Sequence, residues 1–313
     1  MKNPLVVLTG PTAVGKTALS IALAKSVNGS IISADSIQVY RQMDIGSAKI
    51  KPEEMQGIPH YLIDILDPKE AFDIVTFQRM AKEAMEEIYA QGRIPILVGG
   101  TGFYIQSILK DIAFEEETEH SAFRNQMYDL ARQKGPEFLH ARLQEIDPVS
   151  AKEIHPNNVK RVTRALEFYQ NNGYPISEHN ANEAQKESPY NYAYFVLNQN
   201  RKTLYQHIEA RVDLMMKEGL LDEVKSLVAY GADASDVSMQ GLGYKELLSY
   251  LHGDCSLERA IEIIKRDTRH FAKRQLTWFR RESDVIWIDK DAFQDEDAIL
   301  EFMLAQLKEK QIL

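Results

Sequence analysis

The sequence predicts an α/β protein in which a parallel sheet carries helices on both faces, with a helical insertion domain added to it. Two observations predict this class. Short apolar runs alternate with helical patterns over the first hundred residues, and this alternation stops near residue 115. Buried strands that alternate with helices are typical of a parallel sheet that is covered on both sides.

The elements of the first part follow in chain order. Residues 5–8 form an apolar run that predicts a strand, and residues 18–24 have a helix-forming composition. Residues 30–34 and 94–98 are further short apolar runs, and residues 78–89 between them show helical periodicity. Because ligands of such sheets bind beyond the carboxyl ends of the strands, we expect the functional site where these runs end.

Beyond residue 115 the pattern changes to helical pieces separated by Pro-rich and Asn-rich breaks. We assign residues 116–190 to the helical insertion, between a first core part at residues 1–115 and a second core part at residues 191–313. The second core part is predicted to be mostly helical with two strands. The strands are expected at residues 192–197 and 285–288, and the helices within residues 201–281 and 294–310.

Composition limits the class of protein. Of the 313 residues, 44% are apolar and 27% are charged, as in an ordinary globular protein. Cys255 is the one cysteine, which excludes a disulfide framework and a cysteine zinc finger within this chain. No apolar run is long enough to span a membrane, so we expect a cytoplasmic monomer without a membrane partner.

The net charge of −9 is unevenly distributed. Residues 111–120 and residues 284–313 are both strongly acidic, and without them the rest of the chain is close to neutral. Residues 265–281 hold seven lysines and arginines against one acid. Since the local charge decides whether a surface binds phosphates, an RNA partner is compatible with the acidic total.

The motif at residues 10–17 is the strongest indication of function. It fits Gly-x-x-x-x-Gly-Lys-[Ser/Thr] at every fixed position and lies between a predicted strand and a predicted helix. In such a loop the backbone N–H groups bind a polyphosphate, Lys16 reaches the outer phosphate and Thr17 holds Mg²⁺. The core is therefore predicted to be P-loop nucleoside-triphosphatase-like; the alternative is a glycine turn that binds nothing. The predicted phosphate-binding residues are Gly10, Pro11, Thr12, Ala13, Val14, Gly15, Lys16 and Thr17.

Two further segments follow predicted strands. Asp35 comes directly after the run at residues 30–34, and its carboxylate can hold a metal ion, accept a proton or cap a helix. Residues 98–104 read Val-Gly-Gly-Thr-Gly-Phe-Tyr, in which the glycines allow a ligand to approach the backbone and Thr101 supplies a hydroxyl. A glycine-rich turn between strand and helix is the alternative. The residues alone leave these alternatives open.

Six segments, in this order along the chain, resemble the bacterial tRNA dimethylallyltransferases, which are also called tRNA isopentenyltransferases. The phosphate motif is shared by many families, whereas the ordered set is highly specific, and the resemblance spans roughly residues 4–281. The six segments are residues 10–17, 35–46, 99–101, 160–167, 243–247 and 272–278.

The resemblance implies transfer of a dimethylallyl group from dimethylallyl diphosphate to N6 of the adenosine 3′-adjacent to the anticodon of tRNA, with release of pyrophosphate. It implies that Asp35 is the general base, that Thr101 contacts the substrate, and that Lys16 acts in catalysis on the pyrophosphate, with Mg²⁺ as cofactor on Thr17. The implied partners are the tRNA anticodon stem-loop and dimethylallyl diphosphate. The implied tRNA-binding residues are Asp35, Ser36, Ile37, Gln38, Thr101, Arg124, Lys160, Arg161, Val162, Thr163, Arg164, Gly241, Leu242, Gly243, Tyr244, Lys245 and Glu246.

Other basic and aromatic residues are weaker candidates. Four cations are spaced to share one helix face and suit contacts to phosphates, although such a face is often only solvated. They are Arg266, Arg269, Lys273 and Arg280. A target base has to leave its stack and enter a pocket. The candidates to line that pocket are Phe103, Tyr40 and Tyr244, and the sequence does not choose among them.

Four functions are compatible with these residues. The first is the tRNA prenyltransferase, and the second is a related enzyme that prenylates free adenine nucleotides. The insertion and the basic stretch at residues 160–164 favour the first, because a free nucleotide needs no such surface. The third is a small-molecule kinase that binds ATP, in which Arg161 and Arg164 act on the transferred phosphoryl group. The fourth is a nucleotide-dependent switch without catalysis.

Overall fold

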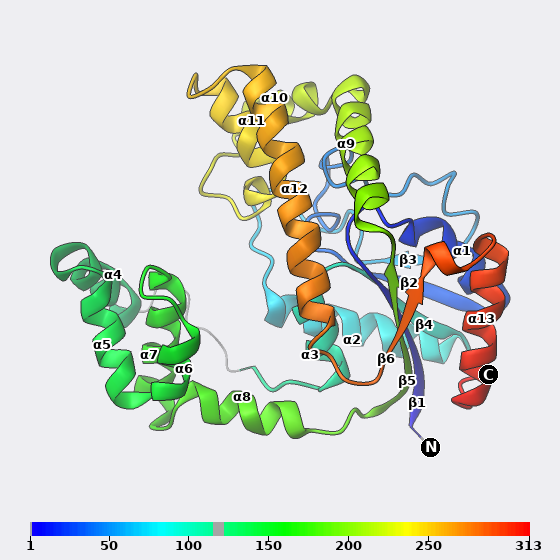
Figure 1. Ribbon diagram of the computed structural model, residues 1–313, viewed down its shortest axis with the longest axis horizontal. Helices are drawn as coiled ribbons and strands as arrows, with labels where there is room; N and C mark the ends of the chain where they lie inside the picture. Colours follow the sequence, from blue (N-terminus) through cyan, green and yellow to red (C-terminus); the bar gives the residue numbers. More distant parts are fainter. Residues whose placement is uncertain (1, 115–121) are drawn as a thin grey trace. The chain divides into compact units, whose positions relative to one another are not determined.

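The computed structural model describes residues 2–114 and 122–313, which divide into two compact units (Figure 1). The first unit combines Met1–Leu109 with Pro189–Leu313, and the second is Lys110–Ser188. The predicted insertion at residues 116–190 largely coincides with the second unit. Its predicted start, like the acidic run at residues 115–119, lies outside the described residues.

The first unit is built on a parallel sheet of six strands, in the order β3-β2-β4-β1-β5-β6. Strands β1 and β2 are almost wholly buried, as expected for strands covered on both faces. The shortest strand has two residues, too few to give a sequence pattern, and was not predicted. The strands are β1 (Asn3–Thr9), β2 (Gly29–Ala34), β3 (His60–Tyr61), β4 (Ile94–Gly99), β5 (Tyr190–Asn198) and β6 (Val285–Asp289).

Alternate residues of β1 enter two different cores. Leu5 and Val7 belong to one hydrophobic cluster, and Val6 and Leu8 belong to the other. The first cluster is covered by α2 (Ile74–Ala90), α3 (Gly102–Leu109), α10 (Leu220–Tyr230), α11 (Tyr244–Leu251) and α12 (Leu257–Phe279). The second is covered by α1 (Lys16–Ser26) and α13 (Glu296–Glu309), and α9 (Arg201–Glu218) contributes to both. The predicted fold, a parallel sheet with helices on both faces, is therefore confirmed.

The second unit is helical in its described part and has a small core of its own, which includes Met127, Leu139 and Val162. Asp147 is buried, and its carboxylate accepts the backbone N–H and the hydroxyl of both Ser150 and Ser177, which ties three of the helices together. The helices are α4 (Ala122–Lys134), α5 (Pro136–Ile146), α6 (Pro148–Glu153), α7 (Val159–Asn172) and α8 (Ile176–Gln185).

The carboxyl edge of the sheet brings together three loops that are distant in the sequence. Residues 10–15 follow β1, residues 35–49 follow β2, and residues 100–101 follow β4, and these three strands are neighbours in the sheet. This is the edge at which ligands of parallel sheets bind. Within the described residues, no helix has both the length and the apolar character that a membrane crossing requires.

Candidate functional site

The loop at residues 10–17 has the conformation that its glycines predict. Gly10 and Gly15 have φ angles of 145° and 91°, and a Cβ on Gly10 would lie 2.6 Å from the carbonyl oxygen of Leu197. Gly15 precedes α1 and provides no side-chain cap, so the N–H groups of the first helical turn are not satisfied by a capping side chain. A loop of this shape, ending at a helix N-terminus, favours an anion.

Lys16 lies in this loop with its ammonium turned toward the backbone. Its Nζ donates to the carbonyl oxygens of Gly10 and Pro11, each at 2.9 Å. Burial and, second to it, the positive charge of Arg211 lower the pKa of Lys16 to about 7, and the carboxylate of Asp35 opposes this shift. A bound anion would favour the charged ammonium.

Arg211, on α9, is a second cation at this place and was not predicted from the sequence. Burial lowers the pKa of its guanidinium, whereas Asp35 raises it. Among the described residues, no side chain or backbone group forms a hydrogen bond with this guanidinium. Two cations that share one carboxylate leave net positive charge at the loop, which favours a ligand with more than one negative charge. The sequence signal was weak because Arg211 is one of several cations in a long helical stretch.

Asp35 uses its two carboxylate oxygens differently. Oδ1 accepts the backbone N–H groups of Ile37 at 2.9 Å and Gln38 at 3.3 Å, which closes a turn at the end of β2. Within the described chain, Oδ2 accepts no hydrogen bond and the side chain is half-buried. Oδ1 of Asp35 therefore closes the turn, as the capping alternative predicts, and Oδ2 is available to a substrate.

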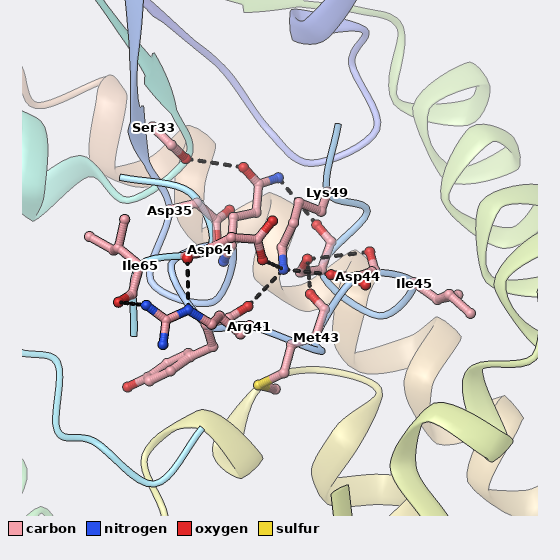
Figure 2. Close-up of polar contacts among 12 residues, drawn as sticks. Ser33, Asp35, Arg41, Met43, Asp44, Ile45, Lys49, Asp64 and Ile65 are labelled. Atoms are coloured by element: carbon pink, nitrogen blue, oxygen red, sulfur yellow. Dashed lines mark hydrogen bonds and ion pairs between the residues drawn. The ribbon is translucent and has the colours of Figure 1, made fainter. Parts of the chain in front are cut away.

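The loop that carries Asp35 is held by a buried lysine, as Figure 2 shows. The Lys49 side chain is 4% exposed, and its Nζ donates to the carbonyl oxygen of Tyr40 at 2.7 Å. It also forms ion pairs with Asp44 at 2.6 Å and Asp64 at 2.5 Å. Three oxygen partners satisfy the three donors of the ammonium, so Lys49 ties Tyr40 and Asp44 of this loop to each other and to Asp64.

Glu223, on α10, fixes the far end of the same loop. Its carboxylate accepts the backbone N–H groups of Asp44 at 2.9 Å, Ile45 at 2.7 Å and Gly46 at 3.0 Å. The hydroxyl of Tyr244 donates to it as well, at 2.7 Å. A Cβ on Gly46 would lie 2.5 Å from the Tyr244 ring, which explains why this position requires glycine. Glu223 was not predicted as part of the site.

The third loop packs directly on the end of β2. A Cβ on Gly99 would lie 2.2 Å from the carbonyl oxygen of Ala34, and the N–H of Thr101 donates to the same oxygen at 3.3 Å. Thr101 is half-buried, and its hydroxyl forms no hydrogen bond within the described residues. The close contact places Thr101 next to the loop that begins with Asp35.

Comparisons with known proteins agree with this arrangement. The family model described as IPP transferase matches residues 38–282. The chain belongs to this family. A tRNA dimethylallyltransferase of Lachnoclostridium phytofermentans is 57% identical over 311 residues, covering 99% of both chains.

Solved structures of the family are similar over the whole chain. The full-length tRNA isopentenylpyrophosphate transferase of Bacillus halodurans is 44% identical with a TM-score of 0.75, covering 99% of this chain and 98% of that one. A eukaryotic dimethylallyltransferase, described as acting on tRNA, is 31% identical with a TM-score of 0.83. That match covers 97% of this chain and 78% of that one.

In this IPP transferase, the candidate tRNA contacts of the second unit divide by exposure. Lys160, Arg161 and Arg164 are exposed on α7, as a phosphate-binding face requires. Val162 and Thr163 between them are fully buried in the core of the unit. Arg124 forms an ion pair with the buried Glu167 at 2.6 Å, so its guanidinium already has a carboxylate partner. The structure therefore does not support direct RNA contacts by Val162 and Thr163.

The candidates at residues 241–246 are mostly inaccessible. Lys245 is exposed, whereas Tyr244 is fully buried against Glu223 and Glu246 caps α11 through the N–H of Gly243 at 2.8 Å. Tyr40 is also fully buried. Of the three aromatic candidates for a base pocket, Phe103 alone is accessible. The structure supports a packing role for Tyr40 and Tyr244.

The basic face of α12 differs from the predicted one. Arg266 is paired with Asp267 at 2.8 Å and Arg269 with Glu209 at 2.6 Å, while Lys273 and Arg280 are exposed. An open groove of about 470 Å³ runs along the same helix. Its lining is His270, Lys273, Arg274, Thr277, Trp278 and Arg281. The accessible positive charge thus lies toward the C-terminal end of α12.

Proposed function

We propose that this IPP transferase transfers the dimethylallyl group of dimethylallyl diphosphate to N6 of the adenosine 3′-adjacent to the anticodon of tRNA. One observation carries the proposal. The loops that carry Lys16 and Asp35 follow β1 and β2 at the same edge of the sheet, and the carboxylate of Asp35 acts electrostatically on both Lys16 and Arg211, so a proton acceptor and two cations belong to one site. A kinase would break a bond between phosphorus and a bridging oxygen, whereas this transferase breaks the bond between the allylic carbon and the bridging oxygen. The group that the acceptor receives, phosphoryl or dimethylallyl, distinguishes the two reactions.

The cations are suited to the departing pyrophosphate. As the bond between the allylic carbon and the bridging oxygen breaks, negative charge grows on the diphosphate. Lys16, Arg211 and the N–H groups of the loop at residues 10–15 can stabilise this charge. The loop therefore holds a leaving group, and the chemistry does not require ATP.

Asp35 is suited to the acceptor. The exocyclic amine of adenine is a weak nucleophile because its lone pair is delocalised into the ring, so it gains from a base as it attacks the allylic carbon. The oxygen of Asp35 that accepts no hydrogen bond from the described residues takes the proton from N6, while its other oxygen stays bound to the N–H groups of Ile37 and Gln38. General-base help of this kind is worth about 10²–10⁴-fold in rate.

Mg²⁺ fits this loop through Thr17. Its hydroxyl is exposed in the first turn of α1 and forms no hydrogen bond within the described residues. No group of three or more acidic, histidine or cysteine side chains could hold a metal ion in the described part of the chain. Mg²⁺ would therefore rest on Thr17 and on the phosphates of the substrate, as is usual for this ion, and would add positive charge at the leaving group.

The exposed cations suit a tRNA acceptor. Lys160, Arg161 and Arg164 on α7, with Lys273 on α12 and Arg280 directly after it, are exposed, as phosphate contacts require. Such contacts supply affinity and salt dependence without reading the sequence. A free adenine nucleotide would need neither surface.

The experiment is a matrix of donors and acceptors with purified protein and Mg²⁺. The donor is labelled dimethylallyl diphosphate or labelled ATP, and the acceptor is unmodified tRNA or AMP. We expect label in tRNA with dimethylallyl diphosphate alone. Label in AMP instead would identify a free-nucleotide enzyme, and phosphoryl transfer from ATP would replace the proposal with a kinase.

A further inference from the structure

One buried side chain connects the phosphate loop to the loop that carries Thr101. Gln275 lies near the end of α12 and is 6% exposed. Its Oε1 accepts the backbone N–H of Thr12 at 2.9 Å, and its Nε2 donates to the carbonyl oxygen of Gly100 at 2.9 Å. The two partners belong to the loops after β1 and β4, far from Gln275 in the sequence.

The chemistry of the two partners requires an amide. A backbone N–H can only donate and a carbonyl oxygen can only accept, so the orientation of the Gln275 amide is fixed by its partners. A Cβ on Gly100 would lie 2.1 Å from Nε2, so a side chain at this position would displace the amide. An ionised glutamate can accept but has no donor until it is protonated, and methionine has neither the donor nor the acceptor.

The contact is reinforced one turn further along α12. A Cβ on Gly102 would lie 2.2 Å from the Trp278 ring, so the helix packs on residues 100–102 at two successive positions. Trp278 keeps the loop close to α12 when the amide of Gln275 is removed. Without the amide, the phosphate loop and the Gly100–Thr101 loop can therefore shift relative to each other, although each stays attached to the core.

We propose that Gln275 is a positioning residue, which sets the phosphate loop and the Gly100–Thr101 loop at the separation that aligns donor and acceptor. The inference rests on the proposed function, because it assigns the leaving diphosphate to the first loop and the acceptor to the second. Gln275 touches neither substrate. It acts through the backbone of Thr12 and Gly100.

We expect the loss of the Gln275 amide to slow the chemical step and to leave substrate binding roughly unchanged. Because the Thr12 N–H already donates to Gln275, the proposal assigns the diphosphate to Lys16 and to the other N–H groups of the loop, none of which forms a hydrogen bond with Gln275. Misplacement of reacting groups by about 1 Å can cost on the order of 10²-fold in rate. We therefore expect Gln275→Met to lower the single-turnover rate by at least about tenfold, with roughly unchanged dissociation constants for pyrophosphate and tRNA.

Gln78→Met is the matched control. Gln78 is also a buried glutamine, and its Nε2 donates to the carbonyl oxygen of Ser107 at 2.8 Å, between α2 and α3. Both variants should lower the melting temperature, because each leaves buried backbone groups without a partner. Only Gln275→Met should slow the transfer per folded molecule.

Gln275→Glu gives a readout that a purely structural role would not move. Its carboxylate can still accept from Thr12, but it repels the Gly100 carbonyl until the carboxyl is protonated and regains a donor. The rate of this variant relative to wild type at the same pH should therefore rise as the pH falls. This measurement also decides the matter if Gln275→Met does not fold.

The outcomes separate this proposal from the proposed function. If wild type and Gln78→Met transfer the group to tRNA but Gln275→Met does so within about threefold of wild type, Gln275 is only structural. A pH-independent ratio for Gln275→Glu would overturn the proposal as well. If wild type itself transfers nothing to tRNA, the proposed function fails first.

Discussion

At the scale of single residues, the two oxygens of Asp35 separate a structural role from a chemical one. Asn at this position keeps an oxygen that can accept from Ile37 and Gln38, but it has no carboxylate to accept a proton. We expect Asp35→Asn to fold with near wild-type stability, to bind tRNA normally and to lose turnover by at least about 10²-fold. Single-turnover transfer to tRNA measures this. Near-normal chemistry in the variant would show that Asp35 only closes a turn.

Lys16 makes diphosphate binding depend on pH. Its pKa is lowered to about 7 by burial first and by Arg211 second, so in the free protein the ammonium loses its proton as the pH rises through that value. A bound diphosphate favours the ammonium and raises the pKa, so binding above pH 7 takes up a proton. The affinity for pyrophosphate should therefore fall as the pH rises above about 7.

Calorimetry in buffers of different ionisation enthalpy measures this proton uptake. Pyrophosphate also titrates, so the quantity of interest is the difference between wild type and Lys16→Ala. Equal uptake by the two proteins would show that the Lys16 ammonium keeps its proton in both states.

At the scale of elements, the segment at residues 35–49 owes its shape to residues outside it. Glu223 accepts hydrogen bonds from three consecutive backbone N–H groups and from Tyr244. Gln at this position keeps one oxygen as an acceptor, but its NH₂ group then faces N–H or O–H groups that also donate. Glu223→Gln should therefore reduce the free energy of unfolding by about 2 kcal/mol or more. Urea unfolding measures this loss. Asp222→Asn on the same helix is the control, since the exposed pair of Asp222 with Lys225 should change stability by about 0.5 kcal/mol at most. Similar losses in both variants would show that Glu223 is not an anchor.

The exposed face of α7 provides the second test at this scale. Arg161 and Arg164 lie three residues apart on α7 and are exposed, whereas Val162 and Ala165 of the same helix are buried. Replacing both arginines by Ala should weaken tRNA binding and reduce the log–log salt slope by roughly 0.7–0.9 per lost phosphate contact. Filter binding across a salt series measures the slope, with Arg132→Ala on α4 as an exposed control. An unchanged slope and affinity in the double variant would leave α7 as a solvated face.

Local features of the site could be predicted, and long-range ones could not. The loop at residues 10–17 could be predicted from its motif, and Asp35 from the apolar run that directly precedes it, because each signal is contained in a few consecutive residues. Arg211, Glu223 and Gln275 act on loops that are more than a hundred residues away, and each looks like an ordinary polar residue of a helix. Tyr244 was predicted as a site residue because it lies in a recognisable segment, but that segment does not indicate that the side chain is fully buried.

At the scale of the whole molecule, the order of the segments predicted more than any single motif. The parallel sheet follows from apolar runs that alternate with helices, and the order β3-β2-β4-β1-β5-β6 then places the first, second and fourth strands side by side. The strand order itself depends on contacts between segments far apart in the chain and has no local signature in the sequence. The two-residue β3 is likewise held by its neighbour β2, through pairing of Ile31 with His60.

The central claim is that one adenosine of tRNA becomes dimethylallylated, and the most direct measurement locates that modification. Unmodified tRNA is incubated with the protein, Mg²⁺ and dimethylallyl diphosphate, then digested with a base-specific ribonuclease and analysed by mass spectrometry. We predict that a dimethylallyl group replaces one hydrogen in the single fragment that holds the adenosine 3′-adjacent to the anticodon, and that Asp35→Asn leaves this fragment unmodified. An unmodified fragment with wild-type protein, or a modification at another position, would contradict the account.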